Sequence, residues 1–335
     1  TRNISLKLLK FVTNKTAMQF RTQIPIPKNN YPIDYNATIM SLGSCFAVNI
    51  AEKLDYFKFH NNCNPFGILF HPLAIEKILD FAVSGKHFTE NDVFFYNERW
   101  HCFDVHSDCS NSNKEDLLAS LNTIIKSTKL QLQEASHIII TYGTSWVYRN
   151  TEGNSIVANC HKVPQKQFKK ELLSVEEIEK GIANTIKLIY SVNPNCTIIF
   201  TVSPVRHIKD GFVENQVSKA NLISALYTVL QVSPSGAEGV YFPSYEIMMD
   251  ELRDYRFYAE DMLHPNPVAI DYIWERFKET TISETAFSTM AEVGNIQKSL
   301  SHRPFNPKSK SHLKFESKVR EKIIKLENQY SFMKF

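Results

Sequence analysis

Short apolar runs alternate with segments of helical periodicity along most of this chain. The apolar runs predict strands at residues 38–42, 56–59, 137–142, 197–202 and 240–242. Apolar residues at helical spacing predict helices at residues 45–54, 72–83, 112–127, 174–191, 215–231, 244–253 and 267–279. Strands that alternate with helices are typical of an α/β fold in which helices cover both faces of a parallel sheet. The strands lack polar alternation, which agrees with a sheet buried on both faces.

Three parts of different character follow one another. We expect residues 1–18 to be a disordered N-terminal extension, residues 19–280 to form the main domain, and residues 281–335 to form a helical C-terminal extension. Residues 85–110 are rich in aromatic side chains and poorly periodic, so they predict an inserted hairpin or lid. Residues 150–173 predict a second insertion.

The C-terminal extension carries a cluster of basic residues beside a helical stripe of Val319, Ile323 and Leu326. The basic residues are Lys308, Lys310, Lys314, Lys318, Arg320, Lys322 and Lys325. One interpretation is a binding surface for an anionic partner. The interpretation we favour is an amphipathic helix that packs on the main domain and leaves its basic face in water.

Composition limits the classes of function. A net charge of +3 over 335 residues is too small to indicate a nucleic-acid partner or a membrane surface. No apolar run reaches the roughly 18 residues of a membrane span. The six cysteines are scattered through a chain large enough to fold without disulfides, so we expect reduced thiols in a cytoplasmic protein.

The turn after the first predicted strand carries two nucleophile-capable residues, Ser44 and Cys45, behind Gly43. It lies between a buried strand and the start of a helix, where free N–H groups and the helix dipole stabilise negative charge. A cysteine in that position is expected to have a lowered thiol pKa. The alternative is a small buried cysteine in a strand-to-helix turn.

Asp261 and His264 form a D-x-x-H motif late in the chain. An aspartate three residues before a histidine can lie behind the imidazole, fix its tautomer and stabilise the imidazolium. Cys45, residues 143–145 and residues 203–207 all follow predicted strands, and ligands of parallel α/β sheets bind at that edge. The pattern therefore predicts one site that combines a nucleophile with a base.

A zinc site is the competing interpretation of the insertions. Cys102, His106, Cys109, Cys160 and His161 supply enough ligands. Their spacing fits no compact zinc-finger pattern, and residues around Cys102 look like a strand. We therefore expect no metal and no cofactor.

The motifs together resemble a known family. The chain is identified as a member of the GSCFA family by Gly43–Ala47 (GSCFA), Asn64–Gly67 (NPFG), Thr141–Trp146 (TYGTSW), Asn159–Lys162 (NCHK), Ser203–His207 (SPVRH) and Asp261–His264 (DMLH). That family resembles the SGNH/GDSL hydrolase superfamily. The resemblance implies a three-layer α/β/α fold with the flavodoxin-like strand order of SGNH proteins.

The resemblance also implies roles for individual residues. Cys45 takes the place of the SGNH nucleophile, where a serine is expected; a turn shifted by one residue would make Ser44 the nucleophile instead. Gly67 takes the place of the glycine whose N–H joins the oxyanion hole. Ser145 stands where the superfamily has an oxyanion-binding asparagine, and Asp261 with His264 matches the catalytic pair.

Five further residues of these motifs are candidates for substrate binding. Trp146 would wall the pocket, and His161, Lys162, Arg206 and His207 belong to family motifs without a superfamily counterpart. The Arg206 guanidinium would hold a carboxylate or phosphate of the substrate, and Lys162 or Lys219 would add charge.

Two functions remain open. The first is a hydrolase or acyltransferase that acts on an ester, a thioester or an acylated carbohydrate through an acyl-enzyme on Cys45 or Ser44, with His264 and Asp261 as the base pair. The second is a non-catalytic module that binds a glycan or peptide on the same scaffold. The departures from the SGNH pattern at Cys45 and Ser145 motivate the second.

Overall fold

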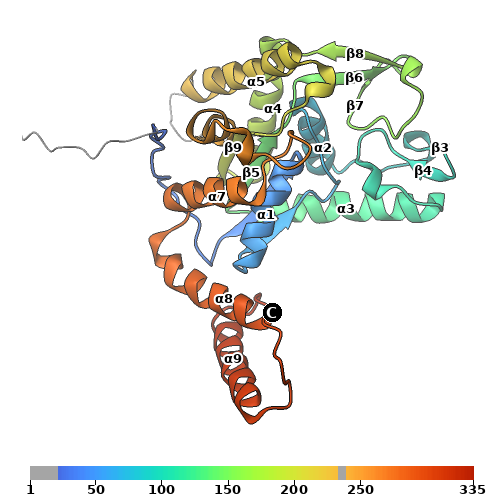
Figure 1. Ribbon diagram of the computed structural model, residues 1–335. Helices are drawn as coiled ribbons and strands as arrows, with labels where there is room; N and C mark the ends of the chain where they lie inside the picture. The colour runs from blue at the N-terminus through green and yellow to red at the C-terminus, as the bar shows by residue number, and fades with distance from the viewer. Residues whose placement is uncertain (1–21, 233–238) are drawn as a thin grey trace, which may run out of the picture.

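The computed structural model describes residues 22–232 and 239–335, so the prediction for residues 1–18 lies outside the described residues. Five parallel strands form the central sheet, in the order β10-β9-β5-β1-β2 (Figure 1). The strands are β1 (Thr38–Gly43), β2 (His60–Cys63), β5 (His137–Tyr142), β9 (Thr197–Val202) and β10 (Val240–Phe242). In chain order this is the flavodoxin-like order 2-1-3-4-5, so the predicted fold class is confirmed.

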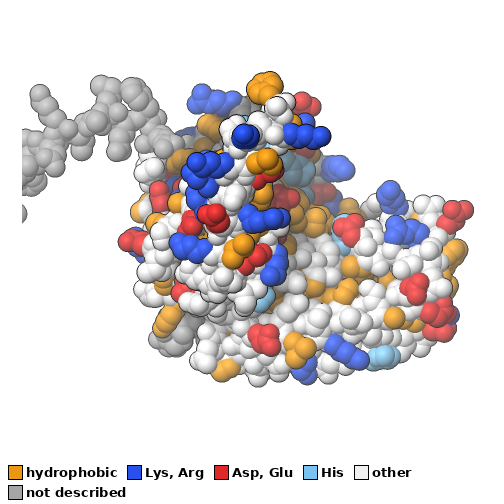
Figure 2. All heavy atoms as spheres, turned by 90° about the horizontal axis from the view of Figure 1, so that it is seen from below, with side chains coloured by type: hydrophobic (Ala, Val, Ile, Leu, Met, Phe, Trp, Pro, Cys, Tyr) orange, Lys and Arg blue, Asp and Glu red, His pale blue; other side chains and the backbone are white. Residues whose placement is uncertain are grey.

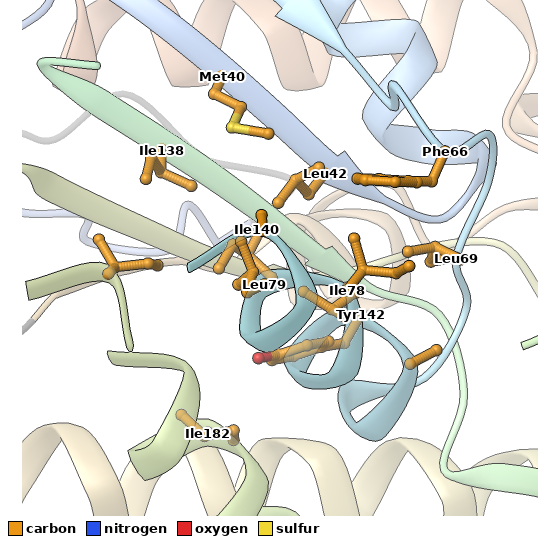
Figure 3. Close-up of a cluster of buried hydrophobic side chains, with 14 of the residues drawn as sticks. Met40, Leu42, Phe66, Leu69, Ile78, Leu79, Ile138, Ile140, Tyr142 and Ile182 are labelled. Atoms are coloured by element: carbon orange, nitrogen blue, oxygen red, sulfur yellow. The ribbon is translucent and has the colours of Figure 1, made fainter. Parts of the chain in front are cut away.

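Helices cover both faces of this sheet because each central strand is apolar on both sides. Met40, Ile138 and Phe200 point to one face, and their neighbours Ile39 and Ile199 point to the other. The helices on the first face are α2 (Pro72–Ser84), α3 (Lys114–Glu134), α4 (Val175–Val192) and α5 (Phe212–Val232). Figure 3 shows part of this core, in which strand side chains meet those of α2 and α4. The opposite face is covered by α1 (Cys45–Tyr56) and α7 (Pro267–Thr281).

Most elements lie where the periodicity places them, with three differences. The strand predicted at 56–59 is instead β2 at His60–Cys63, because α1 continues to Tyr56. The cap of α3 is Asn113, whose side chain accepts from the Asp116 N–H, and the helix runs seven residues beyond its predicted end. The helix predicted at 244–253 is a short α6 (Ser244–Glu246) followed by a π-helix at Ile247–Leu252.

The two insertions form small antiparallel sheets beside the main sheet (Figure 1). The first contains the hairpin of β3 (Phe94–Tyr96) and β4 (Arg99–His101), as the aromatic-rich segment predicts. The second has the order β7-β6-β8. Its strands are β6 (Trp146–Asn150), β7 (Ile156–Val157) and β8 (Phe168–Leu172).

The C-terminal segment forms two helices that project from the α/β body, α8 (Phe287–Leu300) and α9 (Lys310–Gln329) (Figure 1). Val319 and Leu326 are buried against α8 and the α1 side of the sheet, as the helical stripe predicts. The seven basic residues at 308–325 are all exposed. Figure 2 views this end of the molecule and shows Lys and Arg side chains among hydrophobic and acidic ones.

Within residues 22–232 and 239–335, no helix is both long enough and apolar enough to cross a membrane.

Candidate active site

The end of β1 turns sharply into α1, and Gly43 makes that turn possible. Its φ of +133° is a conformation that L side chains rarely adopt, and an added Cβ would lie 2.1 Å from the Thr141 carbonyl oxygen on β5. Its N–H donates to Asn64 Oδ1 at 2.8 Å. Any other residue here would push β1 away from β5, so the position of the following two residues depends on this glycine.

Ser44 and Cys45 differ in their access to substrate. Ser44 is the N-cap of α1, has no exposed surface, and its hydroxyl has no hydrogen-bond partner among the described residues. Cys45 is the first residue of the helix and is partly exposed. The Ser44 hydroxyl is enclosed in this structure and Cys45 is partly exposed, so Cys45 is the more accessible of the two; which of them attacks stays a prediction.

The electrostatics of Cys45 differ from the sequence-based expectation. Burial raises the pKa of the thiol, although Lys219 and the N–H groups of Cys45 and Phe46 act in the opposite direction. The expected lowering by the helix N-terminus is present but is outweighed by desolvation. At rest the residue is a thiol whose ionisation is helped by one nearby cation.

That cation, Lys219, is buried at the carboxyl ends of two strands. Only 1% of its surface is exposed, and its Nζ donates to the carbonyl oxygens of Gly143 at 2.6 Å and Ser203 at 2.7 Å. No carboxylate within the described residues forms an ion pair with it. Burial lowers the pKa of Lys219 to about 7, and Cys45 acts against that shift.

The N-terminal part of α5 presents a buried polar face to this edge of the sheet. Asn215 accepts the His207 N–H at 2.8 Å, and Ser218 accepts the Ser145 N–H at 2.8 Å. Lys219 completes the face. Lys219 was expected only to add charge to the site; its spacing of three and seven residues from the buried Leu222 and Leu226 was the signal that it faces inward.

His264 and Asp261 form the pair that their spacing predicts. Asp261 Oδ2 lies 2.6 Å from His264 Nδ1, and Oδ1 accepts the N–H groups of Leu263 and His264. These hydrogen bonds, the backbone ones foremost, lower the pKa of Asp261 to about 2. An ionised carboxylate only accepts, so Nδ1 carries the hydrogen and Nε2 is free to take a proton.

Arg206 holds this pair in position. Its N–H donates to the Leu263 carbonyl at 3.1 Å, and its guanidinium donates to the Met262 carbonyl at 3.1 Å. The guanidinium also lies 5.4–5.7 Å from the ring centres of Phe212, Tyr255 and Tyr258. One guanidinium N–H is engaged with the D-x-x-H loop, and Arg206 also lines the cavity beside the site, so its role in binding a substrate anion stays a prediction.

His207 is influenced by two other ionisable groups of the site, Lys219 and His264. Burial, with Lys219 and His264 adding to it, lowers the pKa of His207 to about 3. Its ring packs edge-on against Phe70, with 5.9 Å between ring centres. Its Nε2 is buried and has no hydrogen-bond partner in the described part of the chain.

A cavity of about 440 Å³ opens beside these residues. Phe70, Trp146, Val157 and Val205 contribute apolar surface. Its polar lining includes Thr144, Asn159, Arg206, Lys209, Asp210, His207 and His264. Among the residues proposed for substrate binding, Trp146, Arg206 and His207 lie in this wall.

The other two residues proposed for substrate binding lie elsewhere. His161 is buried among the insertions, where its Nε2 donates to the Cys102 carbonyl at 2.7 Å and its Nδ1 accepts from Ser107 at 3.0 Å. Lys162 is exposed and, like His161, does not line the cavity. The NCHK motif reaches the cavity through Asn159 and Cys160 instead.

Both residues expected in the oxyanion hole use their donors inside the protein. The Gly67 N–H donates to the Asn64 carbonyl at 2.8 Å, and an added Cβ at Gly67 would meet His106. The Ser145 hydroxyl donates to the Ser218 carbonyl at 3.1 Å. Neither donor is free for a substrate in this conformation, which differs from the expectation.

Four groups of the site influence one another: Cys45, Lys219, His207 and His264. Lys219 acts on Cys45 and on His207, His264 acts on His207, and Asp261 is hydrogen-bonded to His264. No hydrogen bond joins the Cys45 sulfur to His264 in the part of the chain that is described. No group of three or more His, Cys, Asp or Glu in residues 22–232 and 239–335 is arranged to hold a metal ion.

The sequence comparisons agree with this arrangement of motifs. The profile of the GSCFA family matches residues 38–277. The chain belongs to the GSCFA family. A second profile, that of the C-terminal domain of GSCFA domain proteins, matches residues 293–335 and so covers α9 and most of α8.

Two other comparisons were made for this GSCFA protein. No protein of curated function matches it by sequence. Among solved structures it is similar to an acetyl xylan esterase, Est2A, from the rumen bacterium Butyrivibrio proteoclasticus, with a TM-score of 0.38 and 9% identity. The match covers 75% of this chain and 66% of the esterase, so the chain spans about two thirds of that protein's length.

Proposed function

We propose that this protein is an SGNH-like hydrolase or acyltransferase that forms an acyl-enzyme on Cys45. The observation that carries the proposal is the hydrogen bond of 2.6 Å between His264 and Asp261, at the sheet edge where Cys45 begins α1. An oriented imidazole that lines a largely apolar cavity, together with a partly exposed thiol at the start of α1, suits acyl transfer.

The reaction proceeds in two steps. In the first, His264 takes the thiol proton, the Cys45 sulfur bonds to the substrate carbonyl carbon, and the bond to the leaving alcohol or thiol breaks as that group takes the proton. In the second, His264 takes a proton from water or an acceptor alcohol, whose oxygen attacks the thioester. The carbon–sulfur bond then breaks, and the thiol recovers the proton.

Lys219 and Asp261 stabilise the charges that these steps create. The Lys219 ammonium faces the Cys45 thiolate, and the two carbonyls that hold Nζ keep the ammonium in place. The Asp261 carboxylate faces the imidazolium of His264. Both groups are held in place before reaction, which is the property that makes electrostatic stabilisation effective.

The cavity favours a substrate with a small apolar or acyl portion. The rings of Phe70 and Trp146 and the side chain of Val157 suit an acyl chain or the apolar face of a sugar. The substrate class is therefore an ester, a thioester or an acylated carbohydrate.

A binding module on the same scaffold is the second candidate. The raised pKa of Cys45 and the absence of a hydrogen bond from its sulfur to His264, within the described residues, favour it. Against it, hydrogen bonds of catalytic pairs are often formed only in the substrate complex.

The test is acylation by p-nitrophenyl acetate, read as p-nitrophenol release and by peptide mass spectrometry after an acid quench. We expect an acetyl group on Cys45 and none on Ser44. Cys45→Ala is expected to abolish the reaction, and His264→Ala to slow it by about 10²–10⁴-fold. His87→Gln is the matched control, because His87 is exposed and lies outside the cavity lining.

Other results would point elsewhere. Acetylation of Ser44, or its labelling by a fluorophosphonate, would make the serine the nucleophile. No acylation at either residue, with ligand binding that His264→Ala leaves unchanged, would favour the binding module.

A further inference from the structure

The two hydrogen-bond donors expected to stabilise the oxyanion already donate to other groups of the protein. The Gly67 N–H and the Ser145 hydroxyl, which the family pattern offers, donate to Asn64 and Ser218. The N–H groups of Cys45 and Phe46 act on the Cys45 thiol, whose pKa they lower. Acyl transfer needs donors aimed at the carbonyl oxygen, and removing a single one typically costs a large factor in rate.

One ring nitrogen of His207 makes no hydrogen bond within the described residues. Its Nε2 is buried without a partner in the described residues, and its ring lines the cavity. Buried polar atoms nearly always have a hydrogen-bond partner, so an unpartnered one beside a cavity indicates a ligand atom. The residue is also firmly placed, because its N–H donates to Asn215 and its ring packs on Phe70.

The charges around His207 keep its ring neutral. Lys219 approaches from α5, His264 from the D-x-x-H loop, and Arg206 is the preceding residue, so each of these neighbours is a cation or becomes one. Burial, followed by Lys219 and His264, lowers the pKa of His207 to about 3. A neutral imidazole has one N–H to donate and is not consumed as a base near neutral pH.

The geometry points to His207 as the oxyanion donor of this site: its Nε2–H binds the substrate carbonyl oxygen as negative charge develops there. Lys219, which faces the nucleophile, and His264, which transfers the proton, both act on the His207 ring, and His207 and His264 line the same cavity. His207 would have the role that an asparagine has in SGNH enzymes, although it follows a different strand of the sheet. This inference rests on the proposed acyl-transfer function.

The test compares three proteins in acylation by p-nitrophenyl acetate. His207→Phe keeps a ring against Phe70 but has no donor, and His207→Gln keeps an N–H donor. We expect His207→Phe to lower kcat by about 10²–10³-fold with little change in KM. His207→Gln is expected to recover most of that loss.

The pH profile and a vibrational measurement separate this role from others. Since the His207 ring is neutral throughout, His207→Phe is expected to lower the pH–rate curve without changing its shape. The acetyl-enzyme is accumulated in a His264→Ala background, once with His207 retained and once with His207→Phe added. Its carbonyl stretching frequency is expected to be lower where His207 is retained, since a hydrogen bond weakens the C=O bond.

Each outcome bears on one proposal. No acylation of the unsubstituted protein would overturn the acyl-transfer function itself. Acylation with equal rates and equal carbonyl frequencies for the unsubstituted protein and His207→Phe would overturn the role of His207 and leave that function standing. If thermal melting finds His207→Phe unfolded, His207→Leu takes its place in both measurements.

Discussion

A buried lysine without a carboxylate partner among the described residues is the residue that most constrains this site. Moving an ammonium group from water into a protein is unfavourable unless it loses its proton or faces an anion. Lys219 has two carbonyl oxygens for its hydrogens, and the nearby group that can become an anion is the thiol of Cys45. The thiol and the amine therefore titrate as a coupled pair, not as two independent groups.

Removing this cation should make Cys45 harder to ionise. In Lys219→Met we expect the midpoint of the pH dependence of Cys45 alkylation by iodoacetamide to rise by about one pH unit or more, because the thiolate loses its nearest countercharge. The rate is measured peptide by peptide, with Cys63 as an internal reference whose own pKa burial raises to about 12. Lys126→Met, a change at an exposed lysine, should leave the midpoint of Cys45 unchanged.

An unchanged midpoint in Lys219→Met would contradict this coupling. Thermal melting of both variants is the control for folding, since Lys219→Met also leaves the carbonyls of Gly143 and Ser203 without their donor.

At the scale of elements, local patterns predict most of the fold. The strands 137–142, 197–202 and 240–242 lie where the apolar runs put them, and Ser174 and Glu177 form the capping box that opens α4. These features depend on neighbours within a few residues, which the sequence displays directly. The Asp261–His264 pair was predictable for the same reason, since one turn of chain contains both partners.

Contacts between segments that are far apart in the chain could not be predicted from the sequence. Two examples are the carbonyls that accept hydrogen bonds from Lys219 and the Ser218 carbonyl that accepts one from the Ser145 hydroxyl. Both depend on where α5 crosses the ends of β5 and β9. The expected lowering of the Cys45 pKa failed for a similar reason. A helix N-terminus is visible in a sequence, whereas the degree of desolvation that outweighs it is a property of the packed molecule.

The C-terminal helices offer a test of which residues hold an element in place. Leu326 on α9 is 1% exposed and belongs to the core cluster that includes α1 and α7, whereas Ile324 is 50% exposed. We expect Leu326→Ala to lower the free energy of unfolding by about 2–5 kcal/mol, through lost burial and a new cavity. Ile324→Ala, the matched control, should change it by no more than about 0.5 kcal/mol. Urea unfolding followed by circular dichroism measures both.

Equal effects of the two substitutions would contradict this packing. A loss confined to a separate, earlier unfolding transition would mean that α8 and α9 unfold independently of the α/β body.

At the scale of the whole molecule, burial or partial burial keeps several histidines neutral. His71 caps α2, with its Nδ1 accepting from Ala74 and its Nε2 donating to the Val157 carbonyl. His161 links the two insertions in the same way, through Cys102 and Ser107. His207 joins the loop after β9 to α5 and to the cavity. Each joins two segments that are far apart in the chain, so the protonation of these rings affects the assembly of the molecule.

Burial lowers the pKa of His71 and His161 to about 4 and that of His207 to about 3, against 6.5 for the free side chain. Between those values the unfolded chain binds more protons than the folded one, so stability is fully present above about pH 6.5 and is lost as the pH falls towards 4. Each histidine should contribute a slope of up to about 1.4 kcal/mol per pH unit. We therefore expect urea midpoints to fall steeply between about pH 6.5 and about pH 4.5.

His71→Asn, which keeps a capping side chain, should be less stable at neutral pH but show a shallower slope, whereas His87→Gln should keep the slope of the unsubstituted protein. Equal slopes in all three proteins would mean that His71 is not buried as a neutral ring.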